Sequence, residues 1–298
     1  MQKNGIALLI TLLFIMLITV SIGFGLKQLN LASGYVDNEK FLYQSSVILD
    51  DVLGYLKTSQ ELNDINSSED LDLFLAQASF IPFQIKDLKI SIELSSARSK
   101  FNINSLIDKK KPDTKKVEIL KQYLSNHMIN ISFVDILLDS MGGIKEDLSY
   151  NSGLFDEKPY LFRDYISSYE QFSELEAYYK KYYHDDSLKN IDFKNLFYFS
   201  HDKNYKIDLN YATKETWEMM LGCGESRAVQ LSEADYDSYE SLGMDVEELN
   251  ILKHRFKTSF FEPYIYVVIT VMKNNNNAII SFEYDMKKKE GYDFVYEI

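Results

Sequence analysis

Histidine and cysteine, residue types that often carry catalysis or bind zinc, are few and scattered in this chain. Its four histidines stand in helix-like or polar stretches far from one another: His127, His184, His201 and His254. Cys223 is the single cysteine, and its acidic neighbours Glu218 and Glu225 disfavour the thiolate that a nucleophile needs. No zinc-protease helix, phosphate loop or dinucleotide motif accompanies them. We therefore interpret these side chains as structural, and we predict that the chain is not an enzyme.

Acidic side chains gather at two places where a cation could bind. Asp235, Asp237 and Glu240 form one cluster, and Asp185-Asp186 forms the other. Calcium takes six to eight oxygen ligands in proteins, usually several from carboxylates. Because the first cluster lacks the full EF-hand pattern, we interpret both as solvated acidic surface. A calcium site elsewhere stays open, with its ligands unknown.

The charge of the chain argues against nucleic acid as a partner. Residues 209–231 resemble a helix-hairpin-helix with Gly222-Cys223-Gly224 at its turn, and DNA-binding versions offer backbone N–H groups to phosphate. From 208 to 250, however, two basic residues (Lys214 and Arg227) face eleven acidic ones, and the whole chain carries a net charge of −13. Non-specific affinity for DNA comes mainly from neutralised phosphates. The hairpin is therefore predicted to be a packing element.

The first element of the fold is an apolar helix at the amino terminus. Ile6–Leu26 contains no charged side chain and has the roughly 20 residues needed to cross a bilayer. Apolar residues continue at helical spacing beyond it: Leu29, Val36, Phe41, Ile48, Val52 and Leu56. Together these segments predict one helix of roughly 50 residues, about 75 Å long. The Lys/Arg bias keeps Lys3 and the amino terminus cytoplasmic and places everything after Lys27 on the outer side of the membrane.

The rest of the chain alternates between strand and helix patterns. Apolar and polar residues alternate over 86–94, which predicts a half-buried strand, and residues 101–104 are also predicted to be extended. Strand patterns return at 264–272, 278–284 and 293–298. Helical segments fill the interval: 115–128, 133–139, 172–183, 213–221, 225–231 and 247–256. This order predicts a helical block that interrupts a sheet packed on the amino-terminal helix.

A short basic leader that ends in Gly5 precedes the apolar segment. Such a leader, followed at once by an apolar helix, resembles the leader of type IV pilins and pseudopilins. In that family a membrane peptidase cuts after the glycine and the apolar helix stays on the mature protein. The resemblance places the cut between Gly5 and Ile6. Two other interpretations stay open: a cleaved secretory signal with Ser21-Ile22-Gly23 at its processing site, or an ordinary single-span anchor.

Three local motifs in this order resemble minor pseudopilin K of the type II secretion system. Residues 95–106 read Ser-Ser-Ala-Arg-Ser-Lys-Phe-Asn-Ile-Asn-Ser-Leu. The family carries a similar stretch at the junction between its sheet and an inserted helical domain. Residues 169–175 (Tyr-Glu-Gln-Phe-Ser-Glu-Leu) and 207–213 (Ile-Asp-Leu-Asn-Tyr-Ala-Thr) match two further regions, and 255–261 before the last strands fits too. Members often carry an Asp-Trp-x-Asp element in the helical domain, of which Asp139 keeps only the first acid here, and some members bind calcium in this domain.

The resemblance implies an α/β, pilin-like fold: a long amino-terminal transmembrane α-helix packed on an antiparallel sheet, with a large inserted all-α domain. The expected parts are the leader, the transmembrane part of the helix, the first part of the pilin core, the inserted domain and the carboxy-terminal core strands: 1–5, 6–26, 27–104, 105–262 and 263–298. Most pilins carry a glutamate at the fifth mature position, which minor pseudopilin K typically lacks. That position is Ile10 here.

The function implied is that of a structural subunit at the tip of the type II secretion pseudopilus, which initiates its assembly and takes part in protein secretion across the outer membrane. Ile6 and Ile10 would be assembly residues, and Gly5 and Ile6 the processing site. The implied partners are other minor pseudopilins, the inner-membrane secretion platform and the prepilin peptidase, and the implied location is the bacterial inner membrane with a periplasmic carboxy-terminal domain. The alternatives are a minor pilin of a type IV pilus or competence apparatus, or a membrane-anchored DNA-uptake receptor.

Overall fold

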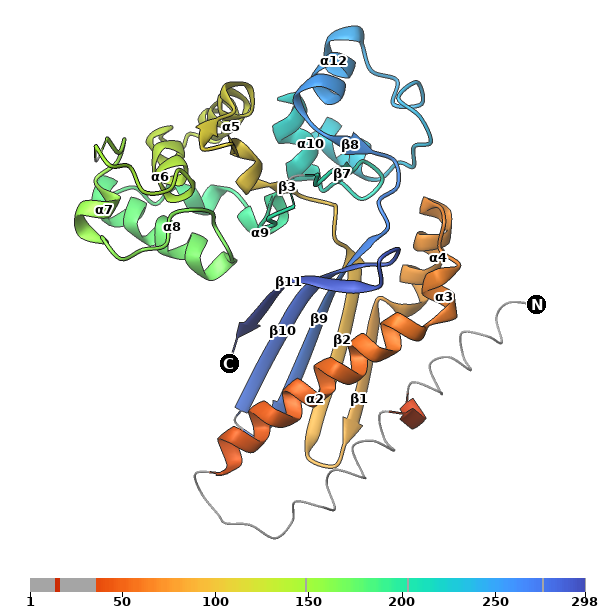
Figure 1. Cartoon of the computed structure of the whole chain (residues 1–298). Coiled ribbons are helices and arrows are strands. Elements are labelled where there is room, and N and C mark those ends of the chain that lie inside the picture. Colours follow the sequence, from red (N-terminus) through yellow and green to blue (C-terminus); the bar gives the residue numbers. More distant parts are fainter. Residues whose placement is uncertain (1–13, 17–35, 148, 203, 275, 298) are drawn as a thin grey trace. The chain divides into compact units, whose positions relative to one another are not determined.

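The computed structural model describes residues 14–16, 36–147, 149–202, 204–274 and 276–297 and divides into two compact units (Figure 1). We call Met1–Ala97 with Pro263–Ile298 the sheet unit, and Arg98–Glu262 the helical unit. Within the described ranges, no helix is both long and apolar enough to cross a bilayer. The predicted membrane segment 6–26 lies outside those ranges apart from residues 14–16.

The sheet unit is built on one antiparallel sheet with the strand order β1-β2-β9-β10-β11. Its strands are β1 Phe80–Ile85, β2 Leu88–Ser96, β9 Tyr264–Lys273, β10 Asn276–Asp285 and β11 Glu290–Glu297. Among its described residues, the same unit contains the helices α2 Val36–Thr58, α3 Gln60–Asn63 and α4 Ser68–Ala78. The predicted antiparallel sheet is therefore present, and β1 adds an edge strand that the sequence patterns did not reveal.

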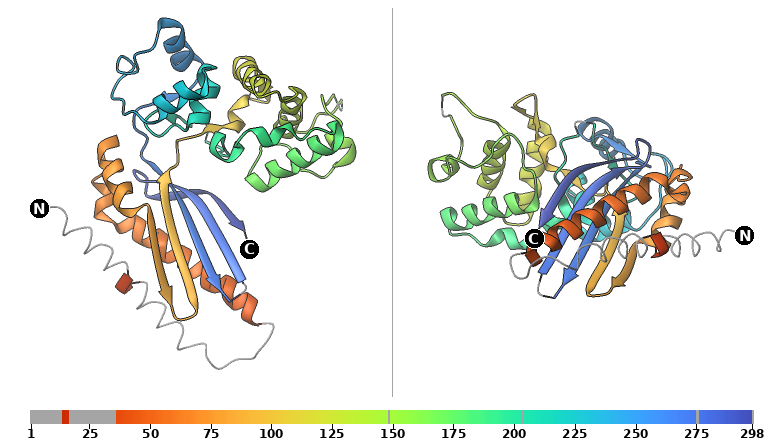
Figure 2. Two further views of the ribbon diagram at one scale, coloured as in Figure 1. Left: turned by 180° about the vertical axis from the view of Figure 1, so that it is seen from behind. Right: turned by 60° about the horizontal axis from the view of Figure 1, so that its bottom comes forward.

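Helix α2 lies across one face of the sheet and contacts β9, β10 and β11 (Figure 2). Its buried apolar side chains include Phe41, Ile48, Val52 and Leu56, which belong to the stripe predicted from helical spacing. On β9, every second residue from Ile265 to Val271 is fully buried, as expected of a strand with one face against a core. Burial of this stripe, rather than helix propensity, is what stabilises α2.

The helical unit interrupts the sheet between two neighbouring strands. The chain leaves β2 at Ser96 and returns in β9, where Ser96 pairs with Ile265. The Ala97 N–H donates to the carbonyl oxygen of Tyr264 at 3.1 Å. The outgoing and returning segments therefore lie side by side where they leave the sheet. The unit starts at Arg98, whereas the sequence patterns placed its first residue at 105.

Helices are the main regular elements of the helical unit. They are α5 Thr114–Asn126, α6 Ser132–Met141, α7 Leu154–Glu157, α8 Tyr169–Tyr183, α9 Phe193–Leu196, α10 Lys214–Leu221, α11 Glu225–Ser232 and α12 Val246–Arg255, with 3-10 turns at Ile103–Leu106 and Ser187–Asn190. Aromatic rings from three of these helices meet in the core, since Phe133 contacts Phe172, Tyr179 and Phe193 at 5.3–5.9 Å between centroids.

The expectation of an all-α insert needs one correction. Among its described residues the helical unit also contains three two-residue strand pairs. They are β3 Phe101–Asn102 with β6 Phe197–Tyr198, β4 Ile107–Asp108 with β5 Lys111–Pro112, and β7 Ile207–Asp208 with β8 Thr258–Ser259. Pairs of two-residue strands are too short to show a periodicity in the sequence, and two of the three also depend on partners far along the chain.

Helix ends in this unit are set by side-chain caps. Asp113, Ser168, Thr213 and Asp245 each accept a hydrogen bond from a backbone N–H in the first turn of α5, α8, α10 and α12. Such a cap satisfies an N–H group that has no partner inside the helix. Gly222 ends α10 with a φ of +63°, a conformation that glycine adopts without strain. Local sequence therefore fixes where these helices begin and end.

Candidate functional site

Asp208, from the third motif, holds both ends of the helical unit together. Its backbone N–H donates to the carbonyl oxygen of Arg98 at 2.9 Å. Its carboxylate Oδ2 accepts the Glu262 N–H at 2.8 Å, and Oδ1 accepts the Asn210 N–H at 3.1 Å. The Asp208 side chain is fully buried. Because Arg98 and Glu262 are the first and last residues of the unit, Asp208 closes it where the chain enters and leaves.

Asn210 extends this network away from the ends. Its Oδ1 accepts the Tyr236 N–H at 2.6 Å, and its Nδ2 donates to the carbonyl oxygens of Tyr236 and Phe260 at 2.9 and 2.7 Å. Thr213, the last residue of the same motif, caps α10, and its backbone N–H donates to the carbonyl oxygen of Ser99 at 3.0 Å. The motif at 207–213 thus joins three distant chain segments through backbone contacts.

The asparagines of the first motif act in the same way. Asn102 is buried, accepts the Ser200 N–H at 3.3 Å and donates to the Ser200 carbonyl at 3.0 Å. Asn104 accepts the Ile166 N–H and donates to its carbonyl, both at 2.9 Å. Each amide pairs with a backbone as another strand would. These motif residues therefore stabilise the fold, and their geometry offers no nucleophile or general base.

Asp139, the remnant of the acidic element, is fully buried and enclosed by hydrogen-bond donors from one loop. Oδ2 accepts the Ser152 N–H and Oγ–H at 2.7 and 2.8 Å, and Oδ1 accepts both the backbone and side-chain N–H groups of Asn151 at 3.1 and 3.3 Å. Lys145 Nζ lies 3.5 Å from Oδ1. The positive charge beside this carboxylate is therefore an ammonium of the chain itself.

The two acidic clusters singled out in the sequence do not have a metal-site geometry either. In the described ranges, no three side chains of histidine, cysteine, aspartate or glutamate come together as metal ligands would. Asp185 instead accepts the hydroxyls of Tyr179 and Ser187, which lower the pKa of its carboxyl, and Asp186 pairs with Lys180 at 2.7 Å. The members of the other predicted cluster are exposed at the surface: Asp235, Asp237 and Glu240.

We predict that calcium does not stabilise this protein through Asp139. A ligand that binds the native state raises stability by RT ln(1 + [L]/Kd), which is about 1.4 kcal/mol at a tenfold excess over Kd. The four hydrogen bonds to Asp139 and the Lys145 ammonium leave no such gain. The difference in Tm between millimolar calcium and chelator should therefore be the same for the wild type and for Asp139→Asn. A rise in Tm with calcium that is lost in Asp139→Asn would contradict this prediction.

The helix-hairpin-helix element is formed by α10 and α11, and its two basic side chains are already paired. Lys214 Nζ lies 2.8 Å from Glu225 Oε1, and Arg227 donates to Glu248 at 2.9 Å. Trp217, a residue of α10, is fully buried. The pairs neutralise the charges that would meet a phosphate, which agrees with the predicted packing role.

The cysteine and a histidine show no catalytic pairing in the described ranges. Burial is the main cause that raises the pKa of the Cys223 thiol, although the Arg227 charge lowers it, so the thiolate is disfavoured. His127 Nε2 lies 3.2 Å from Glu218 Oε1 and its ring packs on Tyr123. His184 takes a left-handed backbone conformation after α8. These placements agree with structural roles.

Comparison with known proteins found a similar fold among solved structures. No protein-family model matches the sequence, and a search of curated proteins found none that matches. The structure is similar to a chain of the crystal structure of the GspK-GspI-GspJ complex from the enterotoxigenic Escherichia coli type 2 secretion system. The TM-score is 0.56 with 15% sequence identity, over 88% of this chain and 95% of that chain. The chain therefore shares the fold of that chain of the secretion-system complex.

This likeness agrees with the resemblance to minor pseudopilin K that the motifs indicate, and at 15% identity it establishes the fold. Gly5, Ile6 and Ile10, the residues assigned to processing and assembly, lie outside the described residues. Cleavage, membrane insertion and the position of the subunit therefore stay predictions.

Proposed function

We propose that this chain is a minor pseudopilin of a type II secretion pseudopilus. The observation that carries the proposal is the antiparallel sheet interrupted between β2 and β9 by a helical unit, a fold shared with a chain of the GspK-GspI-GspJ complex. The proposed partners are accordingly other minor pseudopilins, together with the inner-membrane platform and the prepilin peptidase. The chain would span the inner membrane once, with a cytoplasmic amino terminus and a periplasmic remainder.

We further propose that the subunit sits at the tip of the fibre and starts its assembly. In pilin assembly, the glutamate of an entering subunit pairs with the amino-terminal amine of the subunit above it. An unpaired charge at mid-membrane costs roughly 2.5–3.5 kcal/mol on insertion scales. Ile10 avoids this cost for a subunit with nothing above it, while the amine of Ile6 can still receive a glutamate from below.

Deletion of the gene in its native host should test the proposal. We expect extracellular secretion to stop and the cargo to accumulate in the periplasm, while surface pili and DNA uptake persist. Plasmid-borne wild-type protein should restore secretion. Loss of pili or of DNA uptake with secretion intact would instead favour the alternative, a minor pilin of a type IV pilus or competence apparatus.

The proposed position of the subunit at the tip of the fibre is tested by photo-crosslinking from Ile6 and Ile10 in membranes that assemble pseudopili. A tip subunit should crosslink only to subunits below it, and mass spectrometry of the products should find other minor pseudopilins. Detection of this subunit at regular intervals along the shaft would contradict the tip assignment.

A further inference from the structure

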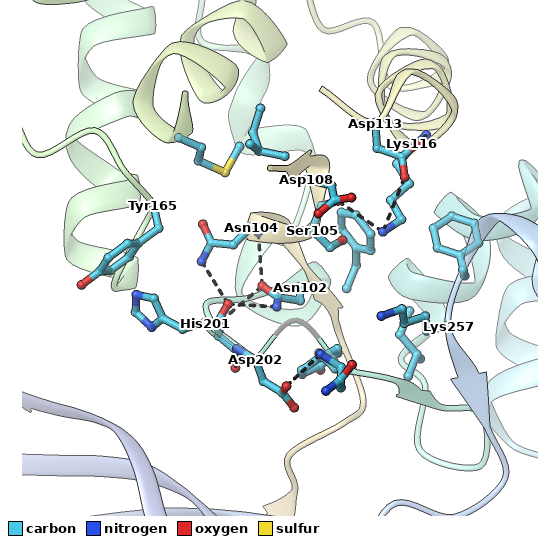
Figure 3. A pocket seen from close by; sticks show the side chains of 18 of the residues that line it. Asn102, Asn104, Ser105, Asp108, Asp113, Lys116, Tyr165, His201, Asp202 and Lys257 are labelled. Carbon is cyan, nitrogen blue, oxygen red and sulfur yellow. Dashed lines mark hydrogen bonds and ion pairs between the residues drawn. The ribbon is translucent and has the colours of Figure 1, made fainter. Parts of the chain in front are cut away.

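The helical unit contains a pocket of about 480 Å³ that none of the motifs explains (Figure 3). Typical ligand sites measure roughly 300–1,000 Å³. Figure 3 shows Lys116, Asp113, Asp108 and Lys257 on one side of the pocket. Tyr165 and His201 lie on the other side, where their rings pack at 3.6 Å between centroids. The pocket thus has a charged end and an aromatic end.

Lys116 is a half-buried cation whose hydrogen bonding is incomplete within the described residues. Its Nζ donates to the carbonyl oxygen of Ser105 at 3.2 Å and lies 3.9 Å from Asp113 Oδ2, which is too far for a hydrogen bond. An ammonium has three N–H donors. Its side chain is only 15% exposed, so water replaces the missing partners poorly. Lys116 is therefore able to donate to a ligand in the pocket.

The electrostatics at this end favour an incoming anion. Burial is the main cause that lowers the pKa of Lys116, which shows that its charge is poorly solvated. The charges of Asp113 and, to a smaller extent, Asp108 oppose the shift, while the neighbouring charge of Lys257 lowers the pKa further. Lys257 is exposed and adds a second positive charge at this end of the pocket. An anion beside the Lys116 ammonium would offset its loss of solvation.

The remainder of the lining limits which anion fits. Four aspartates line the pocket beside the two lysines: Asp108, Asp113, Asp164 and Asp202. They would repel a dianion such as phosphate more strongly than a single carboxylate. Aspartate oxygens also accept hydrogen bonds from N–H groups, and apolar walls come from Phe101 and Phe256. A peptide offers a carboxylate, N–H donors and apolar surface together.

We propose that this pocket binds a carboxylate of a peptide segment, with Lys116 and Lys257 as the residues that receive it. The carboxylate could be a chain terminus or an aspartate or glutamate side chain. The proposal is independent of the membrane position and of the assembly role proposed above.

Fluorescence polarisation with the full-length protein in detergent tests the proposal. The probes are short labelled peptides of one neutral sequence, with a free carboxy terminus, with an amidated terminus, or amidated with one internal glutamate. We expect the peptides that carry a carboxylate to bind and the amidated neutral peptide to bind at least about tenfold more weakly. That ratio follows from the loss of a charge-assisted hydrogen bond. The two carboxylate peptides distinguish a terminus from a side chain.

Substitutions of the pocket lysines test whether the peptide binds in this pocket. Lys116→Gln and, separately, Lys257→Gln should each weaken binding of the carboxylate peptides about tenfold and leave the amidated neutral peptide unaffected. Lys115→Gln is the matched control, since Lys115 is exposed and outside the pocket but loses the same charge. Equal binding of all three peptides, equal effects of all three variants, or displacement by inorganic phosphate at lower concentration than by unlabelled peptide would each overturn the proposal.

Discussion

Replacement of Gly5 by valine should leave the chain at its full length, with residues 1–5 still attached. The prediction rests on the Gly5–Ile6 junction between a short basic leader and an apolar segment. A peptidase site shaped for glycine has no room for a branched side chain, so we expect cleavage to stop completely. Intact-mass analysis of membrane-extracted protein should show wild-type chains that begin at Ile6 and variant chains that begin at Met1.

Gly23→Val is the matched control, because it makes the same change inside the apolar segment. It would disturb the Ser21-Ile22-Gly23 site of a secretory signal, but it lies far from the Gly5 junction. We expect Gly23→Val to be processed like the wild type. A wild-type chain that begins at Phe24, and a cut that Gly23→Val rather than Gly5→Val abolishes, would show a secretory signal peptide instead.

Asp208→Ala should destabilise the helical unit more than any surface substitution in it. The change removes the acceptor for the Glu262 and Asn210 N–H groups. A buried donor left without a partner costs about 1–3 kcal/mol, so we expect the free energy of unfolding to fall by at least that amount for the buried Glu262 N–H, with a smaller loss at the half-buried Asn210. Urea unfolding followed by the fluorescence of Trp217 measures this loss, because the single tryptophan of the chain is buried in the same unit.

The control is Asp237→Ala, which removes an exposed carboxylate from the same unit. Surface changes of this kind usually stay within about 0.5 kcal/mol. Asp208→Asn should fall between the two, since its amide keeps one acceptor oxygen. If Asp208→Ala and Asp237→Ala unfold at the same urea concentration, Asp208 does not stabilise the ends of the unit as the contacts indicate.

The parts of the fold that could be predicted are those that local sequence determines. The pattern for 213–221 matches α10, since Thr213 caps its start and Gly222 ends it. The strand pattern at 86–94 corresponds to β2. In contrast, β1 was missed, because Pro82 interrupts a strand pattern and is tolerated there only at a sheet edge.

The roles of individual polar residues depended on contacts that no local pattern contains. Asp139 stood out as part of an acidic element, but its partners Asn151, Ser152 and Lys145 come from a loop without helical or strand periodicity. Asp208 contacts Arg98 and Glu262, one far before it in the sequence and one far after. The pocket was not predicted either, because Lys116 and Lys257 are brought together only by the fold.

The adjacent exits from β2 and β9 have a consequence for how the chain folds. Without the helical unit these strands would form a local hairpin, but their pairing must instead close a loop of roughly 165 residues. Loop-closure entropy grows as (3/2)RT ln n, so this costs about 2 kcal/mol more than closing a loop of some 15 residues. Once the helical unit has folded, the contacts of Asp208 with Arg98 and Glu262 hold the two ends of this loop together, so strand pairing no longer has to supply the loop-closure entropy. We therefore expect the helical unit to fold first and the central strands to pair after it.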